Sequence, residues 1–281
     1  MSWFLSILLG LGAAYAAIVA AMYFAQDRLI FPNWLTEHAR PELPGTAVRL
    51  QLNAADGVRL AGVYLPAASV RAEPGPLLLG FPGNAWNAEA MALTLHQLLP
   101  DFDVVVFHYR GYRPSNGRPG ASAILADSLA VFDFVQERFR PRPVVAVGVS
   151  IGSPVAAYLA SRRALAGLVL VTPFDSLAAL ARDQYPWAPV RLLLRHSMPT
   201  IDFVRGVPTP TAMIVAGRDA IVPPHRSEPL RRAIPNLVFE ATIEQAGHND
   251  LYDRPAFRDA IRRALAVIIG TPETPPDRGR R

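Results

Sequence analysis

The chain contains no cysteine and no lysine, so all 28 of its basic side chains are arginines. The absence of cysteine excludes thiol nucleophiles, thiolate-bound metals and disulfide bonds. It also removes the usual indicator of the redox state of the compartment. The absence of lysine excludes Schiff bases and serine–lysine dyads. The protein therefore cannot use cysteine or lysine as a nucleophile, and it cannot bind a metal through cysteine.

The overall composition favours one large folded domain. Of the 281 residues, 51% are apolar, which is enough for an α/β domain with a substantial core. The net charge is +5 and the pI is near 9.9, but the arginines are scattered apart from the C-terminal RGRR. No aromatic side chains alternate with them, as they do on many nucleic-acid-binding surfaces. Attraction to an anionic membrane surface explains the charge at least as well, so we expect no nucleic-acid partner.

The first apolar run, Trp3–Phe24, carries no charged side chain. As a helix it would extend about 33 Å, the thickness of a bilayer core. A cleaved signal peptide is the alternative, because AYAAIVAA offers small residues for cleavage. However, the run lacks a basic leader and exceeds the roughly 7–15 apolar residues typical of signal peptides. The sequence therefore predicts an uncleaved single-pass transmembrane anchor over residues 1–26 and a linker over residues 27–45.

Basic residues flank this run on one side only. Arg28, Arg40, Arg49 and Arg59 follow the run, whereas no basic side chain precedes it. The positive-inside tendency therefore favours a cytoplasmic location for the rest of the chain.

Beyond the linker the hydrophobic pattern changes from alternating to continuous. Segments 47–52 and 57–66 alternate around a turn at Asn53–Gly57, which indicates an antiparallel hairpin. Six short apolar runs then alternate with helical segments, a pattern typical of a mostly parallel sheet covered on both faces. The runs are 76–81, 103–109, 143–150, 166–173, 211–217 and 237–242, and the helical segments are 87–99, 121–139, 151–164 and 254–269. We expect an α/β domain over residues 46–270 and a disordered basic tail over residues 271–281.

About 35 residues separate the fourth and fifth of these runs, far more than a crossover needs. This insertion covers about residues 175–208. Above a parallel sheet such a segment often forms a lid, in which Tyr185 and Trp187 would line an acyl pocket. The alternative is an extra packing helix that does not contact substrate.

The segment AVGVSIGS, residues 146–153, contains a Gly-x-Ser-x-Gly motif centred on Ser150. The motif follows a buried-strand pattern and precedes a helical segment, which is the setting of a nucleophile elbow. Side chains in place of Gly148 and Gly152 would collide in so sharp a turn. The helix that follows directs its N–H groups toward charge that develops at the serine. Ser150 is therefore the predicted nucleophile, and a glycine-lined corner without chemistry is the alternative.

A serine hydroxyl needs a general base, and the chain has six histidines. His248 lies in EQAGHNDLY, a polar loop between the last strand pattern and the last helix, from which it can reach back over the sheet. His225 is the alternative, but it lies close to the best acid candidate and is expected to begin a helix on the outside. We therefore predict His248 as the base.

The orienting carboxylate is expected between the serine and the histidine in chain order. Asp219 directly follows the apolar run 211–217, which places it at the carboxyl edge of the sheet. Asp175, one strand earlier, is the alternative. Asp250 is expected to cap a turn or helix. Asp219 is therefore the predicted acid.

Acyl transfer also needs donors for the oxyanion. We predict the backbone N–H of Ile151, directly after the serine, and the backbone N–H of Asn84, in the loop after the run 76–81. Gly83 would let this loop approach the serine closely. A plain strand-to-helix turn is the alternative interpretation of the loop. The reaction requires no metal and no organic cofactor.

Taken together, these motifs make the chain resemble the α/β-hydrolase superfamily, and within it the membrane-anchored serine hydrolases that include the eukaryotic protein depalmitoylases and their bacterial relatives. The motifs that carry the resemblance are, in order, QDRLIFP, FPGNAWN, HYRGYRPSNGRPG, GVSIGS, TPFDSL, GRDAIVPPHRS and GHNDLY. The resemblance implies an α/β-hydrolase fold with a mostly parallel eight-stranded sheet, a Ser150-Asp219-His248 triad, and hydrolysis of esters or thioesters. Three positions depart from the family pattern. Pro82 replaces a histidine, Trp86 stands where a small residue is common, and Arg113 replaces a glycine.

The resulting hypothesis is a membrane-anchored serine hydrolase that acts on a small-molecule or lipid-like acyl substrate through an acyl-enzyme. A catalytically silent, membrane-tethered binding or scaffolding protein with the same fold is the alternative. A dehalogenase or lyase is disfavoured, because such enzymes often carry aspartate at the position of Ser150.

Overall fold

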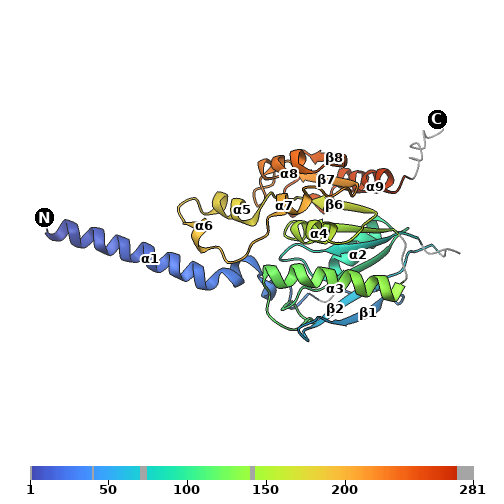
Figure 1. Ribbon diagram of the computed structural model, residues 1–281, viewed down its shortest axis with the longest axis horizontal. Coiled ribbons are helices and arrows are strands. Elements are labelled where there is room, and N and C mark those ends of the chain that lie inside the picture. The colour runs from blue at the N-terminus through green and yellow to red at the C-terminus, as the bar shows by residue number, and fades with distance from the viewer. Residues whose placement is uncertain (1, 40, 70–74, 140–142, 271–281) are drawn as a thin grey trace.

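The computed structural model describes residues 2–39, 41–69, 75–139 and 143–270, so the tail predicted over residues 271–281 lies outside the described residues. A long N-terminal helix, α1 (Ser2–Ile30), projects from a domain built around one sheet (Figure 1). The helix continues past the predicted anchor, so residues 27–30 of the predicted linker are helical.

The sheet has eight strands within the described residues, in the order β1-β2-β4-β3-β5-β6-β7-β8. The strands are β1 (Val48–Asn53), β2 (Arg59–Leu65), β3 (Leu77–Phe81), β4 (Asp103–Phe107), β5 (Val144–Val149), β6 (Gly167–Val171), β7 (Thr211–Ala216) and β8 (Leu237–Ile243). β1 pairs antiparallel with β2, from Val48 opposite Tyr64 to Asn53 opposite Arg59, and β2 pairs antiparallel with β4. All other pairs are parallel. The predicted hairpin and mostly parallel sheet are confirmed.

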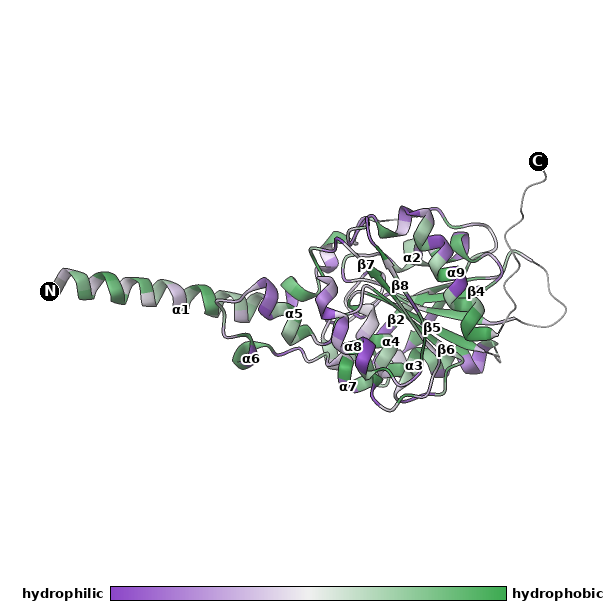
Figure 2. Cartoon of the chain, turned by 90° about the horizontal axis from the view of Figure 1, so that it is seen from above, coloured by the Kyte–Doolittle hydropathy of each residue, from purple (hydrophilic) through white to green (hydrophobic). Residues whose placement is uncertain are grey.

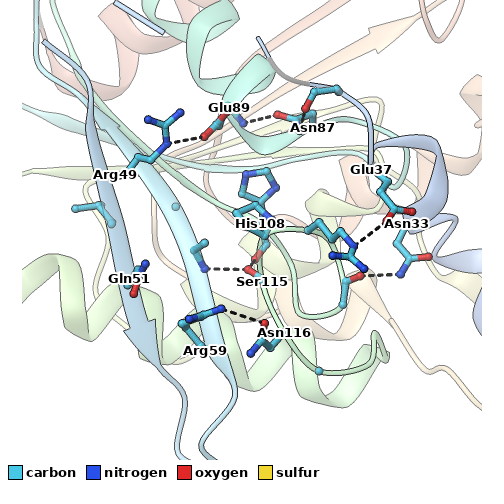
Figure 3. Close-up of a pocket in the computed structure, with 18 of the residues that line it drawn as sticks. Asn33, Glu37, Arg49, Gln51, Arg59, Asn87, Glu89, His108, Ser115 and Asn116 are labelled. Carbon is cyan, nitrogen blue, oxygen red and sulfur yellow. Dashed lines mark hydrogen bonds and ion pairs between the residues drawn. The ribbon is translucent and has the colours of Figure 1, made fainter. Parts of the chain in front are cut away.

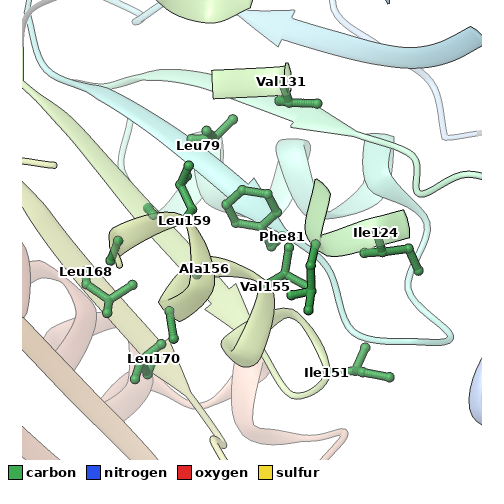
Figure 4. Close-up of a cluster of buried hydrophobic side chains, with 14 of the residues drawn as sticks. Leu79, Phe81, Ile124, Val131, Ile151, Val155, Ala156, Leu159, Leu168 and Leu170 are labelled. Carbon is green, nitrogen blue, oxygen red and sulfur yellow. The ribbon is translucent and has the colours of Figure 1, made fainter. Parts of the chain in front are cut away.

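Helices cover both faces of this sheet, which is why its central strands are apolar at every position. One face packs against α3 (Ala121–Phe139), α4 (Gly152–Ala160), α7 (Thr200–Val204) and α8 (Glu228–Ala233). The other face packs against α2 (Ala88–Leu98) and α9 (Pro255–Ile269). Leu79 and Phe81 of β3 lie in one buried cluster with Val155 of α4 (Figure 4), whereas Leu78 packs on the opposite face.

The insertion between β6 and β7 forms three short helices, α5 (Leu177–Gln184), α6 (Val190–Leu193) and α7. α7 packs against α4 and α8, so this part of the insertion belongs to the body of the domain. α5 and α6 instead lie beside α1 (Figures 1 and 2). Polar contacts tie them there. Gln26 donates from Nε2 to the carbonyl of Leu193 at 3.2 Å and accepts from the N–H of Arg195 at 2.8 Å.

The apolar part of α1 is exposed to its surroundings, and its hydrophobic colouring in Figure 2 runs along the whole projection. By length and composition this helix could cross a membrane. Near the C-terminal end of the helix, Asp27 pairs with Arg195 of the insertion at 2.7 Å. The single apolar helix predicted from the sequence is present.

Candidate active site

Ser150 occupies the turn between β5 and α4, and its φ is +52°. Among the described residues that are not glycine, only Thr172 shares a positive φ. This conformation costs on the order of 1–3 kcal/mol, so the surrounding structure must hold it in place. The N–H of Ser150 donates to the carbonyl of Val171 at 2.9 Å, and its carbonyl accepts from the N–H of Ser153 at 2.9 Å. The strained serine is therefore pinned between β6 and the first turn of α4.

The glycines on either side of Ser150 leave no room for a side chain. A Cβ at Gly148 would lie 2.5 Å from the carbonyl oxygen of Gly152, and a Cβ at Gly152 would lie 2.0 Å from that of Phe81. Both distances are far below van der Waals contact. As predicted, the turn closes tightly because these positions are glycine.

The loop after β3 lies directly against the serine. A Cβ at Gly83 would be 3.8 Å from the Cβ of Ser150, which is ordinary contact. The N–H of Trp86 donates to the carbonyl of Gly83 at 3.2 Å and so tightens the loop. Asn84 directs its side chain away to the end of α1, where Nδ2 donates to the carbonyl of Ile30 at 3.3 Å. Asn84 and Ser150 thus line the same cavity, while Ile151 follows the serine at the start of α4.

Asp219 and His248 lie in contact, although they come from loops after different strands. Nδ1 of His248 is 2.6 Å from Oδ2 of Asp219. The other carboxylate oxygen, Oδ1, accepts from the N–H groups of Ile221 at 2.8 Å and Val222 at 2.7 Å. The side chain of Asp219 is only 1% exposed. Both carboxylate oxygens are therefore satisfied, and the imidazole orientation is set from one side.

The alternative residues are engaged elsewhere. Nε2 of His225 lies 2.7 Å from Oδ2 of Asp183 on the surface. Asp175 pairs with Arg226 at 3.3 Å. Asp250 accepts from the N–H of Gly247 at 2.6 Å, which is the turn-capping role predicted for it.

Ser150 and His248 line the same cavity, which has a volume of about 650 Å³. Gly83, Asn84 and Trp86 form part of its wall. Tyr252 also lines it, a residue that the sequence analysis did not single out. Its ring packs against Trp86 with centroids 4.6 Å apart, and burial raises the pKa of its hydroxyl. The only sequence signal for Tyr252 was an aromatic residue four positions after His248.

A larger cavity of about 1060 Å³ lies between the β1–β2 hairpin, the start of α2 and a stretch that contributes Asn33, Glu37 and Ala39 (Figure 3). Arginine–glutamate pairs form part of its wall, such as Arg113 with Glu37 at 2.7 Å. His108 points into it and is buried with no hydrogen-bond partner for Nε2 among the described residues. Burial lowers the pKa of His108 to about 4. Neither Ser150 nor His248 lines this cavity.

Over the part of the chain that the structure describes, no three His, Asp or Glu side chains gather in a metal-binding arrangement. What the site holds is a hydroxyl, an imidazole, a buried carboxylate and backbone N–H groups. This set suits proton transfer and acyl transfer.

Comparison with known proteins identifies the fold family. Residues 77–196 match the α/β hydrolase fold family. An uncharacterized protein of Mycobacterium tuberculosis strain H37Rv is 38% identical over 224 residues, covering 76% of this chain and 78% of the relative. An uncharacterized membrane protein of Saccharomyces cerevisiae is 28% identical over 274 residues, covering 91% of this chain and 94% of the relative.

Solved structures agree with this assignment. An esterase from Pyrococcus furiosus superposes with a TM-score of 0.65 at 15% identity, covering 81% of this chain and 94% of that chain. An α/β hydrolase from Vibrio vulnificus superposes with a TM-score of 0.66 at 18% identity, covering 85% of this chain and 92% of that chain. The chain therefore belongs to the α/β hydrolase superfamily, and the predicted fold is confirmed. Membership in this superfamily supports a hydrolytic function.

Proposed function

We propose that the protein is a membrane-anchored serine hydrolase that cleaves a carboxylic ester or thioester through an acyl-enzyme. One observation carries the proposal. A serine at positive φ shares a cavity with a histidine whose Nδ1 faces a buried carboxylate. Strained backbone at such a position and an oriented imidazole are both features of activated nucleophiles.

In the proposed mechanism, the Nδ1–H of His248 donates a hydrogen bond to the carboxylate of Asp219, which leaves Nε2 unprotonated and able to act as a base. Nε2 takes the proton of Ser150 as Oγ bonds to the acyl carbon. The backbone N–H groups of Ile151 and Asn84 donate to the oxyanion that forms. His248 then gives its proton to the leaving oxygen or sulfur, whose bond to the acyl carbon breaks. His248 then removes a proton from water as the water oxygen bonds to the acyl carbon, the bond between that carbon and Oγ of Ser150 breaks, and His248 returns the proton to Oγ.

Two comparisons support the finer parts of this proposal. The Pyrococcus furiosus structural neighbour is described as an esterase, and so is a neighbour from Thermogutta terrifontis with a TM-score of 0.58 at 22% identity. The yeast relative is described as a membrane protein, which fits a transmembrane role for α1. The ordered motifs from QDRLIFP to GHNDLY favour the depalmitoylase-like branch of the superfamily. We further propose that the catalytic domain faces the cytoplasm, because basic residues follow the apolar run.

Labelling with a fluorophosphonate probe tests this function. Full-length wild type in detergent should label covalently, Ser150→Ala should not, and Ser161→Ala, at an exposed serine on the end of α4, should label like wild type. Wild type and Ser161→Ala should also hydrolyse p-nitrophenyl acetate, whereas Ser150→Ala should not. A folded wild type that neither labels nor hydrolyses the ester would refute the proposal and favour a silent scaffolding protein.

A further inference from the structure

An apolar groove runs between α1 and the α5–α6 part of the insertion. A hollow of about 100 Å³ is bounded by residues of both elements, including Leu29, Ile30 and Ala188. A second hollow of about 420 Å³ continues along α1 toward Tyr15. Val19, Tyr23 and Leu193 line both hollows, so the two form one groove. From Tyr15 to Ile30 this groove extends about 22 Å along the helix.

The two walls of this groove are held together at both ends. Within the apolar run of α1, the hydroxyl of Tyr15 donates to the carbonyl of Trp187 at 3.0 Å, and the two rings pack edge to face. At the other end Oδ1 of Asp27 lies 2.8 Å from Nε2 of His196. Gln26, which is only 7% exposed, bonds to the insertion between these points. The groove is therefore a built feature of the domain rather than a chance gap beside a projecting helix.

Exposed apolar side chains flank the groove, whose outer end is the one at Tyr15. Leu192 is 85% exposed and Phe24 is 78% exposed, and Trp187 is also exposed. With α1 across a bilayer, the contact between Tyr15 and Trp187 places this end at the level of the lipid chains. Large exposed apolar patches of this kind mark membrane or protein interaction sites.

The inner end of the groove lies next to residues that line the Ser150 cavity. Ile30 lines the groove, and its carbonyl accepts the hydrogen bond from Asn84 in the loop beside the serine. From the insertion, Gln184 at the end of α5 donates to the carbonyl of Ile221 at 3.2 Å. Ile221 and Asn84 both line the Ser150 cavity. α1 and the insertion thus each form a hydrogen bond with a residue that lines the Ser150 cavity.

We propose that this groove holds the acyl chain of a substrate that resides in the bilayer. The carbonyl carbon would lie at Ser150 while the chain runs back along α1 toward Tyr15 and the lipid. The chain would then remain in apolar surroundings throughout the reaction. The inference rests on the proposed hydrolase function and assigns it a substrate class, namely long-chain acyl esters or thioesters embedded in a membrane.

Filling the groove tests this assignment. We would reconstitute the full chain in phosphatidylcholine vesicles and measure kcat/KM for p-nitrophenyl palmitate and p-nitrophenyl acetate. Ala188→Trp should lower the palmitate-to-acetate ratio at least tenfold. Ala55→Trp, on the exposed turn between β1 and β2, is the matched control and should keep the wild-type ratio.

A second variant protects the test against misfolding. Val19→Trp fills the groove from the α1 wall and should lower the same ratio, whereas Ile7→Trp, on an exposed part of α1, should not. If both groove variants remain active on the acetate ester and keep the wild-type palmitate-to-acetate ratio of kcat/KM, the groove does not hold the acyl chain. The inference also fails if they change only the oligomeric state seen by cross-linking, because the groove would then be a contact between copies. A wild type inactive on both esters would instead refute the proposed function.

Discussion

Oδ2 of Asp219 lies 2.6 Å from Nδ1 of His248, although 29 residues separate them in the chain. The loops after β7 and β8 carry the two side chains to the same edge of the sheet, because adjacent parallel strands end side by side. The imidazole is therefore oriented by a buried group whose other oxygen is already occupied by backbone N–H groups.

Asp219→Asn should lower kcat by about 10⁴-fold, because an amide in this place favours the wrong imidazole tautomer. Asp175→Asn is the matched control, and it should lower kcat less than about tenfold, since Asp175 pairs with Arg226 and not with His248. Steady-state hydrolysis of p-nitrophenyl acetate measures both. The reverse ranking would assign the acid role to Asp175.

Gly152→Ala should destabilise the fold by about 3 kcal/mol or more, because its Cβ would lie 2.0 Å from the carbonyl oxygen of Phe81. Gly45→Ala should change the free energy of unfolding by less than about 0.5 kcal/mol, since a Cβ there meets nothing within 4 Å. Urea unfolding in detergent followed by circular dichroism gives both values. If the two variants had the same free energy of unfolding, the turn at Ser150 would have room for a side chain at Gly152, contrary to the prediction.

Burial of His108 predicts a loss of stability in acid. Its pKa is about 4 in the fold and 6.5 when exposed, so the unfolded chain binds more protons between these values. The stabilisation is complete above pH 6.5 and falls by about 3 kcal/mol as the pH drops to 4. His108→Gln should flatten this part of the pH profile of the unfolding free energy. His38→Gln, at an exposed histidine, should keep the wild-type pH profile of the unfolding free energy. If His108→Gln also keeps the wild-type profile, the prediction is wrong.

The absence of cysteine allows a direct measurement of membrane depth, because a single introduced cysteine carries the only label. Nitroxide labels at Leu192→Cys and Ile7→Cys should be accessible to oxygen and shielded from a water-soluble nickel complex. A label at Val267→Cys, exposed on α9, should show the opposite pattern. If the label at Leu192 has the same accessibility as the label at Val267 while the label at Ile7 is shielded from nickel, the insertion lies outside the bilayer. If Ile7 also matches Val267, α1 is not a membrane anchor.

Local patterns accounted for most of the fold. Apolar runs identified the strands, and α3 spans 121–139 as predicted. Element ends were less accurate, because they depend on bonds that the pattern does not contain. The helix predicted over 151–164 ends at Ala160, where the N–H of Ser161 donates to the carbonyls of Ala157 and Tyr158. The sequence did not predict Tyr252 as a cavity residue, because its place in the cavity wall depends on packing against Trp86.

By itself, the sequence determined where the buried strands lie, where a serine sits between two glycines, and which helix is apolar enough to enter a membrane. These features follow from the periodicity and size of neighbouring residues. Only the tertiary structure decided that Asp219 contacts His248 while Asp183 contacts His225, and that Gln26 bonds to Leu193, 167 residues away. Such pairings depend on how distant elements pack in space, and no local pattern encodes the distance between them.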